Sequence, residues 1–111
     1  MNGKWVLETA ANLVHEAFPD RYGIALDEKG NPYISYYDAG VGSLKLAHKK
    51  DQKWINEVVD GNFSGFTSSL QIHDGMIWIS YEDESAKTLK VARRPIEPAT
   101  PQTMSHAERL P

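Results

Sequence analysis

An internal repeat constrains this chain more than any other feature of its sequence. Residues 33–49 and 78–94 align without a gap at an offset of 45 positions, and seven of the 17 aligned pairs are identical. Unrelated segments of ordinary composition would share about one identity. The identical pairs are Ile34/Ile79, Ser35/Ser80, Tyr36/Tyr81, Asp38/Asp83, Leu44/Leu89, Lys45/Lys90 and Ala47/Ala92. A shorter block, Lys4–Glu8, matches Lys53–Glu57 at an offset of 49. Equivalent blocks should therefore share one local structure.

The period of the repeat and its short alternating apolar runs predict an all-β fold made of β-propeller blades. A blade of four antiparallel strands takes about 40–50 residues. Residues 31–94 lack the long 3.6-residue periodicity that helical repeats need. In the first unit we expect strands at Ile24–Leu26, Tyr33–Tyr37, Ser43–His48 and Trp54–Val59. In the second unit we expect strands at Ser69–His73, Met76–Tyr81 and Thr88–Arg94. Segments containing Gly, Pro, Asn and Asp separate most of these runs, as turns require.

The second unit lacks its fourth strand, because Pro95 follows Arg94 directly. The segment Lys4–Thr9 carries the matching Trp and Glu, so we expect it to complete the last blade, in a neighbouring subunit. Two blades cannot close a ring, and each would leave an apolar face and a strand edge open. The sequence therefore predicts a homo-oligomer. A trimer with six blades is favoured over a dimer with four or a tetramer with eight.

The chain divides into a two-blade unit at residues 1–94 and a proline-rich tail at residues 95–111. The blades span about residues 24–59 and 69–94, and residues 4–9 complete the second of them. Four of the six prolines lie in the tail, which we expect to be extended and docked on a neighbouring subunit. Residues 7–18 place apolar side chains at helical spacing, so a short helix is expected within residues 10–18.

Composition argues against several classes of function. The chain has no cysteine, which excludes disulfides and thiolate metal sites. A net charge of −3 without a basic stripe argues against duplex nucleic acid as a partner. No run approaches 18 apolar residues and no signal-peptide pattern follows Met1, so we expect no membrane span, and the cytoplasm is the expected compartment. The four histidines show no metal-ligand spacing, and we expect no cofactor.

Several blocks resemble the repeats of bacterial propeller proteins of the sialidase-like type. They are SSL-x-I at 68–72, W-I-S-Y-x-D at 78–83, T-L-K-V-A at 88–92 and K-W-x-x-E-x-V-D at 53–60. The two-blade architecture also looks like that of the small bacterial fucose-binding lectins, whose subunits form six-bladed trimers. Those lectins hold sugar with an Arg, a Glu and a Trp. Here Ser35 and Ser80 stand near the Arg position, and Leu46 and Val91, or the lysines beside them, near the Glu position. Fucose binding is therefore not implied, and neither the sialidase Asp-box nor its arginine triad is present.

Aromatic and acidic residues in the strands are the candidate ligand contacts. Aromatic rings pack on sugar faces and carboxylates accept hydrogen bonds from hydroxyls, a combination typical of carbohydrate sites. The candidate ligand-binding residues are Tyr37, Asp38, Trp54, Trp78, Tyr81 and Asp83. Each class has a structural alternative: the tyrosines can fill the space between blades, the aspartates can cap turns, and the tryptophans can cover a blade edge. The repeated pairs Lys45/Lys90 and Glu8/Glu57 are expected to form cross-strand ion pairs facing solvent.

Three classes of function remain open at this point. The leading hypothesis is non-catalytic binding of a carbohydrate or another small polar ligand by a lectin-like propeller, because repeated weak sites gain avidity. The alternative is a protein-interaction or scaffold module, since propellers present broad end faces. The third is a hydrolase or lyase at the ring axis. The candidate residues for such an axial site are Asp20, Arg21, Asp27 and His73.

Overall fold

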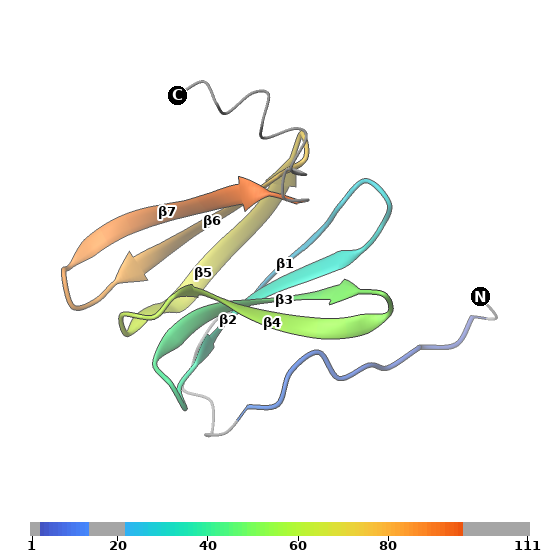
Figure 1. Cartoon of the computed structure of the whole chain (residues 1–111), viewed down its shortest axis with the longest axis horizontal. Helices are drawn as coiled ribbons and strands as arrows, with labels where there is room; N and C mark the ends of the chain where they lie inside the picture. The colour runs from blue at the N-terminus through green and yellow to red at the C-terminus, as the bar shows by residue number, and fades with distance from the viewer. Residues whose placement is uncertain (1–2, 14–21, 97–111) are drawn as a thin grey trace.

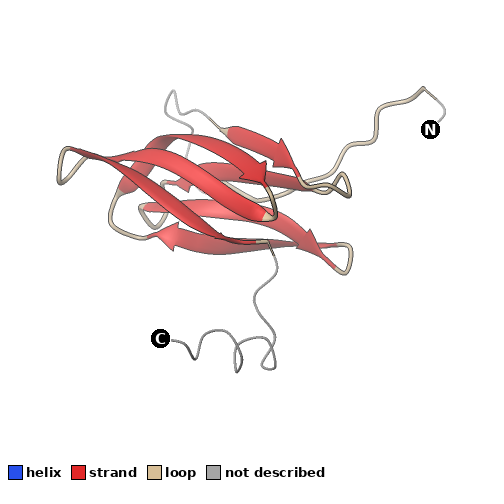
Figure 2. Cartoon of the chain, turned by 90° about the horizontal axis from the view of Figure 1, so that it is seen from above, coloured by secondary structure: helices blue, strands red, loops and turns tan. Residues whose placement is uncertain are grey.

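The computed structural model describes residues 3–13 and 22–96 of the 111-residue chain. Every regular element within these ranges is a β-strand (Figure 2). The strands are β1 (Gly23–Leu26), β2 (Pro32–Asp38), β3 (Ser43–Lys50), β4 (Lys53–Asp60), β5 (Ser64–His73), β6 (Met76–Asp83) and β7 (Thr88–Pro95). All seven strands expected between residues 24 and 94 are therefore confirmed. β5 begins earlier than expected, because an irregularity between Ser64 and Ser68 extends its pairing with β6.

The strands form two antiparallel meanders (Figure 1). Sheet 1 has the order β1-β2-β3-β4, and sheet 2 has the order β5-β6-β7. The register repeats with the sequence, since Tyr36 lies opposite Lys45 in sheet 1 and Tyr81 lies opposite Lys90 in sheet 2. The blocks at residues 33–49 and 78–94 thus adopt one local structure, as their sequence repeat predicts.

Two tight hairpins set the pairing of β3 with β4 and of β5 with β6. Asp51 and Gln52, between β3 and β4, have φ angles of 53° and 68°. Asp74 and Gly75, between β5 and β6, have φ angles of 51° and 73°. Two successive residues with positive φ are the mark of the two-residue turn that matches the right-handed twist of paired strands.

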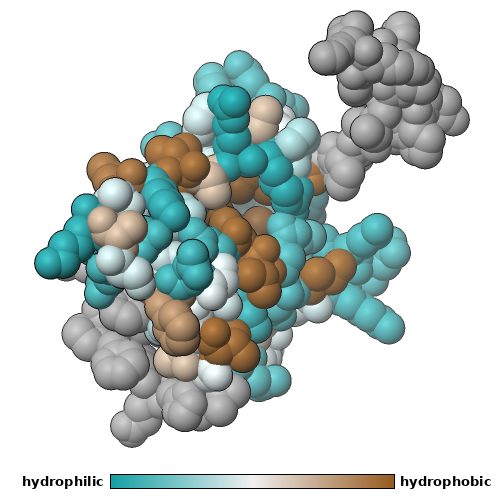
Figure 3. Space-filling model, turned by 60° about the vertical axis from the view of Figure 1, so that its left-hand side comes forward, coloured by the Kyte–Doolittle hydropathy of each residue, from teal (hydrophilic) through white to brown (hydrophobic). Residues whose placement is uncertain are grey.

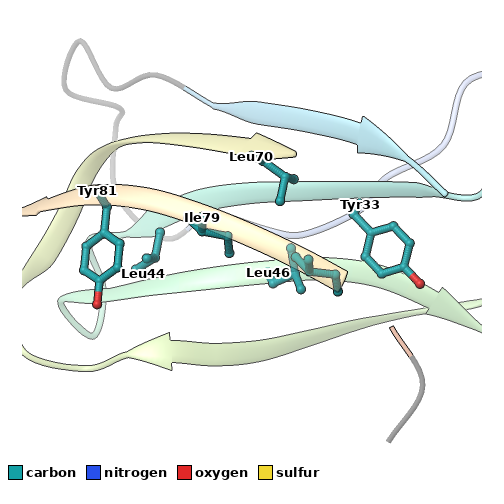
Figure 4. Close-up of a cluster of buried hydrophobic side chains, with 7 residues drawn as sticks. Tyr33, Leu44, Leu46, Leu70, Ile79 and Tyr81 are labelled. Carbon is teal, nitrogen blue, oxygen red and sulfur yellow. The ribbon is translucent and has the colours of Figure 1, made fainter. Parts of the chain in front are cut away.

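The hydrophobic core lies between the two sheets (Figure 4). One face of sheet 1 supplies Tyr33, Leu44 and Leu46 to this core. Sheet 2 supplies Leu70, Ile77, Ile79 and Tyr81. We call the contributing face of sheet 1 its front and the contributing face of sheet 2 its back. The sheets therefore stack front to back, which leaves the back of sheet 1 and the front of sheet 2 on the outside.

The N-terminal segment differs from the sequence prediction. Lys4–Thr9 was expected to be the fourth strand of the second sheet, but residues 3–13 contain no strand, and sheet 2 has three strands within the described residues. A strand needs a neighbouring backbone to pair with, and in the single chain this segment contacts its surroundings through side chains instead. It lies beside sheet 1, on the side away from sheet 2 (Figure 1).

The helix expected within residues 10–18 is absent from residues 10–13, and its remainder lies outside the described residues. The tail, expected to be extended, lies outside them beyond Ile96. No helix that is long and apolar enough to cross a membrane occurs in the part of the chain that the structure describes.

Candidate functional site

A groove of about 1230 Å³ opens between the two sheets, where β1, β3 and β7 end and β2 begins. Turns and hairpin ends form its rim. Asp27 fixes the turn between β1 and β2, because its carboxylate accepts hydrogen bonds from the backbone N–H groups of Lys29 and Asn31. Partial burial alone would raise the pKa of Asp27, but the hydrogen bonds from Asn31 and Lys29 together hold it below the usual value. The carboxylate of Asp27 therefore stays ionised at neutral pH.

Two stacked rings lie on the sheet 1 side of the groove. Tyr33 on β2 faces His48 on β3, with ring centroids 5.5 Å apart and planes inclined by 13°. The two residues are directly opposite each other in the ladder, so the strand register itself holds the stack. Both residues line the groove, and Tyr33, which is 6% exposed, also belongs to the core between the sheets.

An ion pair joins the two sheets beside this stack. Arg94 on β7 donates from Nε to Glu57 Oε1 at 2.8 Å and from Nη2 to Glu57 Oε2 at 3.2 Å. Its third nitrogen, Nη1, donates to the carbonyl oxygens of Pro95 and Ile96. A forked guanidinium–carboxylate pair has a defined geometry as well as charge. All three guanidinium nitrogens are held, so Arg94 is fixed in place before any ligand arrives.

The same ion pair borders a second, smaller space. A cavity of about 210 Å³ continues between the sheets and is lined by Glu57 and Arg94 together with apolar side chains of the core. His48 Nε2 lies 3.4 Å from Glu57 Oε2. This contact is too poorly aligned for a hydrogen bond, and no other described group bonds to that buried nitrogen. The groove thus combines charged, aromatic and apolar surfaces.

The two predicted aspartates cap turns. Asp38 accepts a hydrogen bond from the N–H of Gly40 at 3.0 Å, and Asp83 accepts one from the N–H of Ala86 at 3.0 Å. Both side chains are buried. The hydrogen bond from Lys90, followed by the one from Ala86, lowers the pKa of Asp83 below its ordinary value. The turn-capping alternative for these residues is therefore confirmed.

The predicted tyrosines lie in the protein interior. Tyr37 and Tyr81 are each 7% exposed, and Tyr81 donates its hydroxyl hydrogen to Asp60 Oδ2 at 2.7 Å. Tyr36, the repeat equivalent of Tyr81, donates to Asn56 Oδ1 at 2.7 Å. Burial, with the nearby charge of Asp38, raises the pKa of Tyr36 to about 12. Burial and the bond to Asp60 raise the pKa of Tyr81 to about 12. Tyr81 therefore fills the space between the sheets, as its structural alternative predicted, whereas Tyr36 is buried on the back of sheet 1, outside that core.

The predicted tryptophans lie on different surfaces. Trp78 is 38% exposed on the front of sheet 2, with the guanidinium of Arg93 5.5 Å from its ring centroid. Trp54, on β4, donates from Nε1 to Glu8 Oε1 at 3.1 Å, and Lys49 Nζ lies 5.4 Å from its ring centroid. Neither tryptophan lines the groove. The structure thus distributes the six predicted residues over turns, core and two faces, and their role in binding stays a prediction.

The expected pairing of lysines with glutamates is wrong. Lys45 on β3 forms an ion pair with Asp38 on β2, and Lys90 on β7 forms one with Asp83 on β6. The nitrogen–oxygen distance is 2.7 Å in each pair. The side chain of Glu57 instead reaches across to the other sheet. Glu57 lies opposite Leu46, so its side chain projects from the opposite face of sheet 1 to that of Lys45, and the two cannot pair across the ladder.

Sequence reasoning also missed the residues that define the groove. The six candidate residues named from the sequence include neither Tyr33 and His48 nor Glu57 and Arg94, which all line the groove. One signal was present: the repeat equates Glu8 with Glu57 and Lys49 with Arg94. Both resulting pairs, Glu8–Lys49 and Glu57–Arg94, are ion pairs in the structure.

Of the four residues considered for an axial catalytic site, the structure describes Asp27 and His73. Asp27 belongs to the turn described above, whereas His73 is exposed next to Asp74, with Nε2 3.2 Å from Oδ2. Asp20 and Arg21 lie outside the described residues. Within the described ranges, no group of three or more His, Asp or Glu side chains is placed to hold a metal ion.

Comparisons of the chain with protein-family models, with curated proteins and with solved structures found no match.

Proposed function

We propose that this chain is a two-blade unit of a β-propeller ring, and that it binds a small polar ligand, a carbohydrate before others, in the groove between its sheets without converting it chemically. The observation that carries the proposal is the forked Glu57–Arg94 pair beside the Tyr33–His48 stack. A sugar has hydroxyl groups that hydrogen-bond to charged side chains and a C–H face that packs on rings. The groove brings both kinds of surface together.

The dimensions of the groove and its preformed state support a binding role. Ligand sites are concave, largely preformed and lined by apolar surface with a few fixed polar groups. Glu57 and Arg94 hold each other, and the hairpins at the rim are fixed by their own turns. A ligand would therefore meet groups that need little rearrangement, which limits the entropy lost on binding.

Assembly supports the proposal in a second way. A ring of identical subunits, three by our expectation, presents identical grooves on one particle. Weak single sites then act together on a ligand that is itself repeated, such as a glycan chain. The same arrangement would serve a scaffold protein, so ligand binding needs a direct test.

The direct test is a titration of the whole protein with a panel of simple sugars, followed by amide NMR spectra. We expect shifts confined to residues around Tyr33, His48, Glu57 and Arg94 for at least one sugar. Glu57→Gln keeps the size of the side chain and removes its charge. Because a charge-assisted hydrogen bond contributes about 1.5–3 kcal/mol, affinity should fall by about 10- to 100-fold.

Glu84→Gln is the matched control, since it makes the same change at an exposed turn between β6 and β7. It should leave the affinity unchanged, and urea unfolding should show that both variants remain folded. Silence across a broad panel of neutral and acidic sugars, in solution and on a glycan array, would contradict the proposal. Equal losses for both variants would show that the groove is not the site.

A further inference from the structure

The two faces that form the core recur on the outside of the molecule. The front of sheet 1 is repeated by the front of sheet 2, where Leu89 and Val91 are equivalent to Leu44 and Leu46. Leu44 is 0% exposed, whereas Leu89 is 80% exposed. Leu46 is 1% exposed, whereas Val91 is 61% exposed. Sheet 2 thus presents to solvent the surface that sheet 1 buries, and hydrophobic side chains are visible at the surface in Figure 3.

The complementary face, the back of sheet 1, also has no second sheet packed against it within the described residues. The back of sheet 2 buries Leu70, which is 6% exposed, against the front of sheet 1. Its equivalent on the back of sheet 1 is Ile24, which is 66% exposed, and the neighbouring Leu26 is 58% exposed. The chain therefore carries one internal front-to-back contact and one unused copy of each partner face. Such unlike faces fit together head to tail between identical molecules.

The N-terminal segment marks where the next sheet belongs. Inside the chain, Glu57 on β4 pairs with Arg94 on the back of sheet 2. At the equivalent positions, Glu8 pairs with Lys49 on the back of sheet 1. The N-terminal segment therefore sits against sheet 1 as β4 sits against sheet 2, in the place of the fourth strand of a preceding sheet. The other three strands of that preceding sheet would be β5, β6 and β7 of a second copy.

We infer that residues Lys4–Glu8 add as a strand to β7 of a second copy, while the front of that copy's sheet 2 packs on the back of sheet 1. This inference rests on the two-blade unit proposed above and not on ligand binding. The pairing of β3 with β4, transferred through the repeat, sets the register. The resulting opposite pairs are Lys4/Pro95, Trp5/Arg94, Val6/Arg93, Leu7/Ala92 and Glu8/Val91.

Exposure and charge agree with this register. Trp5, Val6 and Leu7 are 94%, 68% and 89% exposed, so the segment buries little apolar surface in the single chain. The edge of β7 has no strand beside it within the described residues. Trp54 is the repeat equivalent of Trp5, and in sheet 1 the cation of Lys49 lies over the ring of Trp54. In the inferred register, Trp5 lies opposite Arg94, which is the repeat equivalent of Lys49. Open edges and large apolar side chains are unfavourable in water, and strand addition from a second copy removes both.

The chain contains no cysteine, so engineered cysteines can report the contact without interference. A chain with Val6→Cys is mixed with a chain carrying Arg93→Cys, and Leu7→Cys is mixed with Ala92→Cys, under mild oxidation. Adjacent opposite pairs alternate between two spacings, one of which suits a disulfide. We expect a covalent dimer in at least one of these mixtures. The control mixture, Val6→Cys with Ala92→Cys, places the two thiols on opposite faces and should give none.

Solution mass by light scattering completes the test. The unmodified protein should show a multiple of the 12.5 kDa chain, three copies in the proposed ring. A monomer at all concentrations, or equal cross-linking in the control mixture, would overturn the inference. The experiment needs no sugar, and the groove of Glu57 and Arg94 lies within one chain. If one of the two proposals fails its test, the other can therefore still be tested.

Discussion

Leu44 and Leu89 provide an internal comparison, because they occupy the same position in the two units of the repeat. Leu44 is fully buried, so Leu44→Ala should lower the free energy of unfolding by about 2–5 kcal/mol through lost apolar burial and the cavity left behind. In an isolated chain, Leu89→Ala should cost less than about 0.5 kcal/mol, since Leu89 is 80% exposed.

Assembly changes the expectation for Leu89. Burying a whole leucine side chain stabilises by about 1.5–3 kcal/mol, so the four-fifths that is exposed leaves about 1–2.5 kcal/mol to be gained against a second copy. Leu89→Ala should therefore destabilise the assembled protein by about that amount or more for each contact. Its effect should also depend on protein concentration, because association is linked to folding.

Urea unfolding at two protein concentrations, with light scattering on the same samples, measures both effects. The expected result is a concentration-dependent midpoint for the unmodified protein and a weaker dependence for Leu89→Ala. If Leu89→Ala leaves both the midpoint and the mass unchanged while Leu44→Ala shows its full cost, then the front of sheet 2 is not covered, and the reasoning from the repeat fails.

Three further changes test individual contacts. Because the pKa values of Tyr36 and Tyr81 are raised to about 12, their contribution to stability should be complete below about pH 10 and lost as the pH rises towards 12, in step with phenolate absorbance. Since Lys90 lowers the pKa of Asp83, the contribution of that carboxylate should be complete above about pH 4 and lost on further acidification; Asp83→Asn should remove this dependence from acid unfolding curves. Gly65→Ala should destabilise by about 2–4 kcal/mol in thermal unfolding, because Gly65 has a φ of 92° and an added Cβ would lie 2.6 Å from the Cβ of Leu44.

The repeat predicted the strands well because it combines two independent signals at each position. Alternating apolar residues indicate a strand, and the same pattern 45 residues later excludes coincidence. The turns at Asp51 and Asp74 followed from their residue types and loop lengths. Residues 3–13 were the exception within the described residues, since they form neither the strand expected at Lys4–Thr9 nor the start of the helix expected within residues 10–18.

The candidate site was the part that sequence predicted least. A strand pattern tells which side chains share a face, but not which face another sheet will cover. Tyr81 was therefore a candidate ligand contact and lies in the core, while Trp78, next to the buried Ile79, is 38% exposed on the opposite face of the sheet. The pairing of Glu57 with Arg94 links residues 37 positions apart in two sheets. Only the stacking angle and spacing of the sheets bring them together.

The sequence by itself determined the local units of this protein: the seven strands between residues 23 and 95 and the turns that join them. These follow from residue spacing along a single extended chain, where the period of two and the turn residues act locally. The tertiary structure decided which repeated faces are buried and which are exposed, and therefore where the groove lies. That choice depends on how one sheet packs against the next, and no residue encodes it alone.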